Sequence, residues 1–231
     1  MRTRIFARIL TLGAALVLLP SLAMAQLDKL SNQDAVSGLK AALEKGSAVA
    51  VAALGKTDGF FGNQQVKIPL PESIRSAEKI MRNVGMGKYA DELILTMNRA
   101  AEAAVPEAKV LLVNAVKNMS VQDAKGVLTG GNTAGTEYFK RATSEQLRAK
   151  FLPIVQNATK KVDLASKYNQ YADKGAKFGL VKKEDANLDS YVTQKALEGL
   201  FFMVAEEEKK IRANPVQAGS DILKKVFGAL K

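Results

Sequence analysis

Polar residues on the apolar faces of two predicted helices are the strongest candidates for chemistry in this sequence. Glu208 follows Val204 by four residues and precedes Ile211 by three, so it shares their helix face. A buried carboxylate without a partner costs several kcal/mol, so such a residue needs partners. We expect one polar cluster where the two helices cross, either an internal salt-bridge network or a ligand or ion site, formed by Asn98, Arg99, Glu102, Glu207, Glu208 and Arg212.

The chemistry open to this cluster is narrow, because the sequence contains no histidine and no cysteine. Those side chains underlie most catalytic triads and transition-metal sites. Glu207 and Glu208 remain as a candidate acid and base, or as oxygen ligands for a hard cation such as Mg²⁺ or Ca²⁺. The preferred interpretation is a protein that is not an enzyme, and we predict no catalytic residue, cofactor or resident metal.

A glycine-dense segment between two predicted helices is a second candidate site, for an anion. Glycines in such a place let backbone amides converge on an anion at a helix N-terminus, with threonine hydroxyls assisting. The competing interpretation is an ordinary interhelical turn, in which glycine ends one helix and threonine caps the next. The residues concerned are Thr129, Gly130, Gly131 and Thr133.

Two further places are candidates for contact with a membrane or a partner. Phe60 and Phe61 are adjacent aromatics in a glycine-containing loop, and exposed rings there would insert into lipid. Lys224 and Lys225 lie on a C-terminal amphipathic segment whose basic side would suit an anionic surface. For both places the alternative is packing against the helical core.

The hydrophobic pattern predicts helices as the elements that position these residues. Apolar residues recur at intervals of three and four through most of the chain, and period-two alternation is nearly absent. The fold class is therefore all-α, a multi-helix bundle or array. The one segment that we expect to be extended is 65–70, because Pro69 and Pro71 disfavour helical geometry in the residue before each. The predicted helices cover residues 32–54, 71–84, 88–104, 106–118, 121–128, 133–143, 145–161, 164–178, 188–213 and 216–230.

The first 25 residues have the pattern of a secretory signal peptide, with three arginines, an apolar run and small residues before the cleavage site. Cleavage after Ala25 would release a single helical domain, residues 26–231, into the periplasm or the medium. Later apolar stretches are far shorter than the ~20 residues of a transmembrane helix, so we expect no transmembrane segment in the mature chain.

The charge of the chain bears on its partners. Losing the three arginines lowers the net charge from +11 by three, to +8, so the mature protein remains basic. Partners are otherwise unknown. A basic exported protein favours an anionic lipid or an acidic envelope polymer as its partner, and an apolar ligand is a further candidate. Nucleic acid is not an expected partner in that compartment.

An internal duplication is one interpretation of the order of landmarks along the chain, with halves at residues 31–118 and 120–230. Leu70-Pro71 and Leu152-Pro153 stand at a constant offset of 82 positions, and Ser31 and Ser120 each open a predicted helix. Serine caps and helix-starting prolines are common enough to arise separately, so coincidence is the other interpretation.

Six short segments are distinctive: residues 59–63 (GFFGN), 68–71 (IPLP), 97–106 (MNRAAEAAVP), 128–131 (LTGG), 151–153 (FLP) and 205–208 (AEEE). In this order they resemble an exported bacterial family defined as a domain of unknown function. The resemblance covers essentially the whole mature chain. It implies an exported, mostly helical protein, and it implies no activity.

The sequence thus predicts a non-enzymatic helical protein of the periplasm or cell envelope that binds a ligand or acts as a scaffold. One alternative is a carboxylate-based enzyme or hard-cation site at Glu207 and Glu208. Another is a peripheral protein that binds an anionic membrane surface.

Overall fold

The computed structural model describes residues 32–163, 165–169 and 186–214. Within these ranges every regular element is an α-helix or a 3₁₀ turn and none is a strand, which confirms the all-α fold class. In chain order the elements are α2 (Asn32–Leu54), η1 (Glu72–Ile74), α3 (Arg75–Asn83), α4 (Gly87–Ala104), η2 (Val105–Glu107), α5 (Ala108–Lys117), α6 (Val121–Thr129), α7 (Ala134–Thr159) and α9 (Leu188–Ala213).

Most predicted helices are present with bounds close to those expected. α2 and α9 begin and end at the predicted residues. Side-chain caps mark two of the starts, because Ser120 accepts a hydrogen bond from the Asp123 amide at 3.0 Å and Asn187 accepts one from the Ser190 amide at 2.9 Å. The segment 65–70 forms neither helix nor strand. The predicted signal peptide, the predicted helix 216–230 and most of 164–178 lie outside the described residues.

One helix prediction is wrong. The sequence predicts separate helices at 133–143 and 145–161, whereas the structure has the single helix α7. The two residues at the predicted break, Thr143 and Ser144, form hydrogen bonds inside the helix. Their hydroxyls donate to the carbonyls of Phe139 and Lys140, four residues earlier, at 2.7 Å and 2.6 Å.

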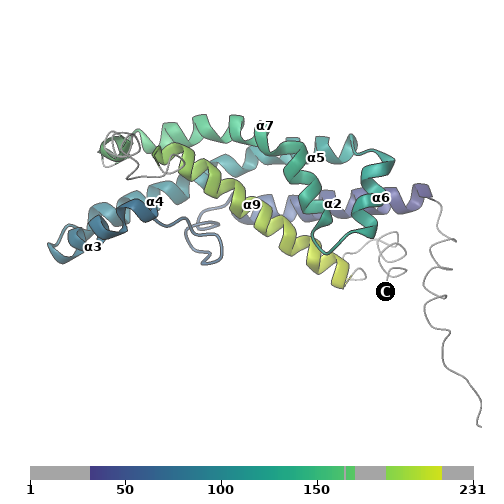
Figure 1. The fold of residues 1–231 in the computed structure, drawn as a ribbon, viewed down its shortest axis with the longest axis horizontal. Coiled ribbons are helices and arrows are strands. Elements are labelled where there is room, and N and C mark those ends of the chain that lie inside the picture. The colour runs from purple at the N-terminus through teal and green to yellow at the C-terminus, as the bar shows by residue number, and fades with distance from the viewer. Residues whose placement is uncertain (1–31, 164, 170–185, 215–231) are drawn as a thin grey trace, which may run out of the picture.

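Helix α9 lies against three other long helices, α7, α2 and α4. Figure 1 shows an elongated array, with the α3–α4 hairpin at one end and α6 with the start of α2 at the other. Three alanines of α4, Ala100, Ala101 and Ala104, have no exposed surface, and their small size lets the neighbouring helices approach closely. Large side chains that are fully buried fill the core, among them Phe60, Phe139, Phe151, Leu93, Met97 and Leu200.

The two predicted halves differ at one of the landmarks that suggested them. Pro71 stands before the turn η1, whereas Pro153 lies in the interior of α7. The two Leu-Pro pairs therefore do not begin equivalent helices, and they lend no structural support to an internal duplication.

Candidate functional site

Asn98, which has no exposed surface, holds the segment 65–70 against the core. Its Oδ1 accepts a hydrogen bond from the Ile68 amide at 2.8 Å, and its Nδ2 donates to the Ile68 carbonyl at 2.9 Å. Nδ2 also donates to the carbonyl of Ile94, one turn earlier in α4, at 2.8 Å. The side-chain amide thus satisfies a buried stretch of backbone that has no helix or sheet to pair with.

Glu102, also in α4, holds the loop that follows α2. Its Oε1 accepts hydrogen bonds from the backbone amides of Phe60 and Phe61, both at 3.0 Å. Its Oε2 accepts from Arg99 at 2.6 Å, and Arg99 also reaches Asp58 at 2.8 Å. Only 4% of Glu102 is exposed. Its buried charge is therefore compensated by two main-chain donors and a guanidinium.

Glu208 of α9 likewise accepts hydrogen bonds from main-chain amides, at the N-terminus of α7. Its Oε1 accepts from the Gly135 amide at 2.9 Å, and its Oε2 accepts from the amide and the hydroxyl of Thr136 at 2.8 Å and 2.9 Å. Arg212 donates to Oε1 through both Nε (3.0 Å) and a terminal nitrogen (2.8 Å), and to the Val127 carbonyl at 2.9 Å. The amides that begin a helix have no partner within it, so a carboxylate is stabilised there.

The six predicted cluster residues therefore form two groups instead of one. Asn98 and Glu208 are buried, as expected, and so is Glu102. Asn98 and Glu102, with Arg99, bind the chain between α2 and α3, whereas Glu208 binds the start of α7 and Arg212 also binds the end of α6. Glu207 instead pairs with a surface lysine, Lys210, at 2.7 Å. The single cluster is wrong because one buried carboxylate binds main-chain amides of the loop after α2 and the other binds those of the first turn of α7, and helix periodicity does not identify such partners.

The predicted anion-binding turn lies beside a bound carboxylate, but that carboxylate belongs to the chain itself. The donors are the amides of Gly135 and Thr136, just beyond the predicted residues. A Cβ at position 135 would press on the Leu43 side chain and lie 3.1 Å from Glu208 Oε1, so any other residue there would displace these side chains. The interpretation as an ordinary turn describes the predicted residues Thr129, Gly130, Gly131 and Thr133 better, since they connect α6 to α7.

Phe60 cannot insert into lipid, because it has no exposed surface. Its ring packs so closely on α9 that a Cβ at Gly199 would lie 2.6 Å from Phe60 Cε1. Phe61 is partly exposed and is covered by cations, with Lys67 Nζ 4.1 Å from the ring centroid and the Arg99 guanidinium 5.7 Å away. This membrane-contact prediction is therefore wrong for Phe60, where core packing applies.

The other predicted membrane contacts, Lys224 and Lys225, lie outside the described residues. Among the helices that are described, none combines the length and the apolar character needed to cross a bilayer.

An open groove of about 950 Å³ lies between the segment 65–70 and α9. One wall is the backbone that Asn98 holds in place. The opposite wall is a face of α9 that includes Tyr191 and Phe202, and the ring of Phe202 is left 38% exposed. Tyr191 also joins the two walls, because its hydroxyl donates to the Pro69 carbonyl at 3.0 Å. Both walls are thus fixed by hydrogen bonds.

Arg148 of α7 lies where this groove meets a second one, of about 480 Å³, between α7 and α9. Arg148 is partly buried, and its guanidinium donates to Gln194 Oε1 at 2.6 Å. Within the described part of the chain no carboxylate pairs with it. Sequence reasoning missed this residue, because one arginine among 34 basic residues has no distinguishing pattern.

The nearby carboxylate Glu198 lines both grooves but is bound by its own helix. Burial acts to raise the pKa of Glu198, but hydrogen bonds from Lys195 at 2.7 Å and Gln194 at 3.0 Å outweigh it. The pKa of Glu198 therefore lies below its usual value, and the group is an anion at neutral pH. Arg148 keeps its positive charge available to a ligand.

The described residues contain no group of three acidic side chains placed to hold a metal ion. No curated protein and no solved structure matches the chain. The sequence model of the family described as "Protein of unknown function (DUF4197)" matches residues 29–228.

Proposed function

The chain belongs to this family of proteins of unknown function, DUF4197, and we propose that it is a non-enzymatic binding protein of the cell envelope. Its ligand is an elongated anion with an apolar part, bound in the groove between the segment 65–70 and α9. The observation that carries this proposal is the position of Arg148, a partly buried cation that has no carboxylate partner among the described residues and lies where two grooves meet.

The composition of the groove supports a ligand of this kind. Four basic and two acidic side chains line it, and the acidic ones are engaged by their neighbours: Glu72 by Arg75 at 3.0 Å and Glu198 by Lys195. The exposed ring of Phe202 offers an apolar surface beside this positive charge. A charge-assisted hydrogen bond from Arg148 would fix the anionic end of the ligand.

The rigidity of the groove also supports binding. Asn98 and Tyr191 hold the irregular wall from opposite sides, so little conformational freedom is left for a ligand to remove. A binding site that is already ordered loses less entropy on association than a loop that must be ordered by its ligand.

The carboxylate-based enzyme is the weaker candidate. Glu102 and Glu208 each use both oxygens to accept hydrogen bonds from amides or guanidinium groups, so neither is available as a base. The cavity beside Glu208 measures only about 10 Å³, which is too small for a substrate. Glu207 is bound to Lys210.

Location in the envelope is supported by the signal-peptide pattern of residues 1–25. N-terminal sequencing of the protein from its own cells checks this point separately, and we expect a mature chain that begins at Gln26.

The binding proposal is tested with a fluorescent long-chain fatty acid as a probe. We expect saturable binding that Arg148→Gln weakens by roughly tenfold or more, the size of a lost charge-assisted hydrogen bond. The matched control is Lys150→Gln, which removes a positive charge from an exposed position of α7 outside the groove. Equal affinity in the two variants, or no binding to the wild-type protein, contradicts the proposal.

A further inference from the structure

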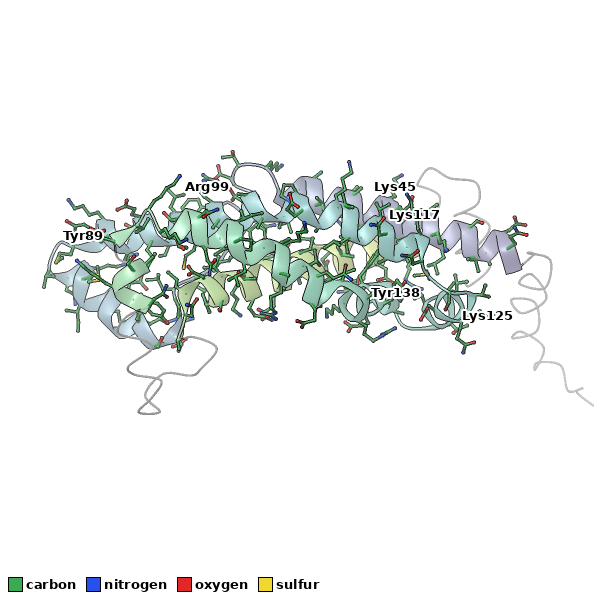
Figure 2. All side chains as sticks on the ribbon, turned by 90° about the horizontal axis from the view of Figure 1, so that it is seen from above. Lys45, Tyr89, Arg99, Lys117, Lys125 and Tyr138 are labelled. Atoms are coloured by element: carbon green, nitrogen blue, oxygen red, sulfur yellow. The ribbon has the colours of Figure 1, made fainter. Side chains whose placement is uncertain are left out.

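The turn between α3 and α4 presents apolar side chains to solvent at one end of the molecule. We define the α3–α4 tip as residues 79–89. Ile80 is 63% exposed, Val84 64%, Met86 46% and Tyr89 43%. Figures 1 and 2 both place this tip at the extremity of the elongated array, and Tyr89 is labelled there in Figure 2. Neighbouring exposed apolar side chains of this kind mark an interaction surface.

The backbone of the tip is fixed by a helix-ending motif. The Met86 amide donates to the Met81 carbonyl at 2.8 Å, and the Gly85 amide donates to the Arg82 carbonyl at 3.3 Å. Gly85 has a φ of +79°, the left-handed conformation that this Schellman motif requires. The apolar side chains are therefore held outward by an ordered turn.

The charges around the tip are basic. Residues 79–90 contain three basic side chains and no acidic one. Arg82 pairs with Glu78 at 2.8 Å and with Asp91 at 2.7 Å, both of which stand just outside the tip. Lys79 and Lys88 have no carboxylate partner in the described part of the chain, and Lys88 Nζ lies 5.1 Å from the centroid of the Tyr89 ring.

We propose that the α3–α4 tip docks end-on into the surface of an anionic phospholipid bilayer. Ile80, Val84 and Met86 enter the boundary between headgroups and acyl chains. Tyr89, whose ring is apolar and whose hydroxyl is polar, occupies the headgroup level, where tyrosine is enriched in membrane proteins. Lys79 and Lys88 extend their amines to the lipid phosphates.

This surface differs from both places at which the sequence predicted membrane contact. Phe60 is unsuitable because it is buried. The sequence did not identify the tip as an exposed surface, because the spacing of the apolar residues in α3 fits a helix that packs on the core. Among the described elements, α3 has extensive contact with α4 and the turn η1 alone, so the described residues leave one of its faces uncovered.

Sedimentation with vesicles tests the proposal on the mature protein, residues 26–231. We expect binding to phosphatidylglycerol vesicles that weakens as salt is raised, and little binding to phosphatidylcholine vesicles. Ile80→Ser combined with Val84→Ser should weaken binding by roughly tenfold or more, because two apolar side chains no longer leave water. A second variant, Lys79→Gln with Lys88→Gln, should weaken binding and reduce its salt dependence while leaving the apolar residues intact.

The matched control is Val110→Ser combined with Val121→Ser. These valines are 65% and 57% exposed but lie on α5 and α6, away from the tip. Arg148→Gln should also bind vesicles normally, which separates this proposal from the groove.

Two outcomes overturn the proposal. One is equal vesicle binding by the wild-type protein and by both tip variants. The other is the absence of vesicle binding by the wild-type protein. If light scattering then showed a dimer that the Ile80→Ser and Val84→Ser changes dissociate, the tip would be a contact between copies of this chain.

Discussion

Glu208 of α9 accepts two hydrogen bonds from Thr136 of α7, one from its backbone amide at 2.8 Å and one from its hydroxyl at 2.9 Å. This contact joins positions that are 72 residues apart in the sequence. The same carboxylate binds the Gly135 amide and Arg212, so it fixes the start of α7 against the end of α9. These two helices form the walls of the second groove, and Glu208 therefore helps to shape it.

Replacing Glu208 by alanine should lower the free energy of unfolding by about 3–5 kcal/mol. The change leaves two buried amides, a hydroxyl and a largely buried guanidinium without their acceptor. Urea unfolding measures the loss. The control is Glu206→Ala, on the same helix, whose pair with Lys209 lies on the surface and should contribute less than about 0.5 kcal/mol. Equal losses in the two variants would show that Glu208 has no special structural role.

Replacing Asn98 by aspartate should be destabilising, although the two side chains have the same shape. Asn98 donates to the carbonyls of Ile68 and Ile94, and a carboxylate offers no donor to either and adds a buried charge. We expect a loss of about 2–4 kcal/mol in urea unfolding, with faster proteolysis within residues 65–70. The exposed Asn114 supplies the control, Asn114→Asp. A protein with an unchanged proteolysis rate after Asn98→Asp would contradict the role of Asn98 as the support of the groove wall.

Ionisation of Tyr138 should lower the free energy of unfolding at alkaline pH. Burial, together with the negative charge of Asp123, raises the pKa of Tyr138 above its usual 10.0. In the unfolded chain the phenol ionises near pH 10, whereas in the folded protein it stays protonated to higher pH. Its contribution is therefore complete below about pH 10 and is lost as the pH rises through the folded pKa.

Tyr138→Phe checks this dependence. The variant loses the hydrogen bond from the hydroxyl to the Ala115 carbonyl, which measures 2.7 Å, so at pH 8 it should be less stable by about 1 kcal/mol. Between about pH 9 and pH 11 it should lose less stability than the wild-type protein. Tyr89→Phe, at an exposed tyrosine, should follow the wild-type curve. If stability fell equally with pH in Tyr138→Phe and in the wild-type protein, the pKa of Tyr138 would not be raised by folding.

The local sequence pattern predicted most of the described helices. The apolar stripe predicted α9 to its observed ends, because helix periodicity acts within a few residues of chain, and Asn187 caps its start. The same rules predicted two helices where the structure has the single helix α7. The hydroxyls of Thr143 and Ser144 serve either to cap a helix or to bond backward inside one, and local sequence does not decide between these two uses.

The sequence by itself indicated that Asn98 and Glu208 are buried, since a stripe of apolar residues defines the face of a helix that turns inward. It placed Glu102 on the more polar side of its helix, and the structure buries that residue too. Only the tertiary structure decided their partners, because these are main-chain groups of Ile68, Phe60 and Gly135, and every residue except proline carries the same amide. Which amide meets which carboxylate depends on how the helices pack, and that packing also forms the groove and leaves the α3–α4 tip exposed.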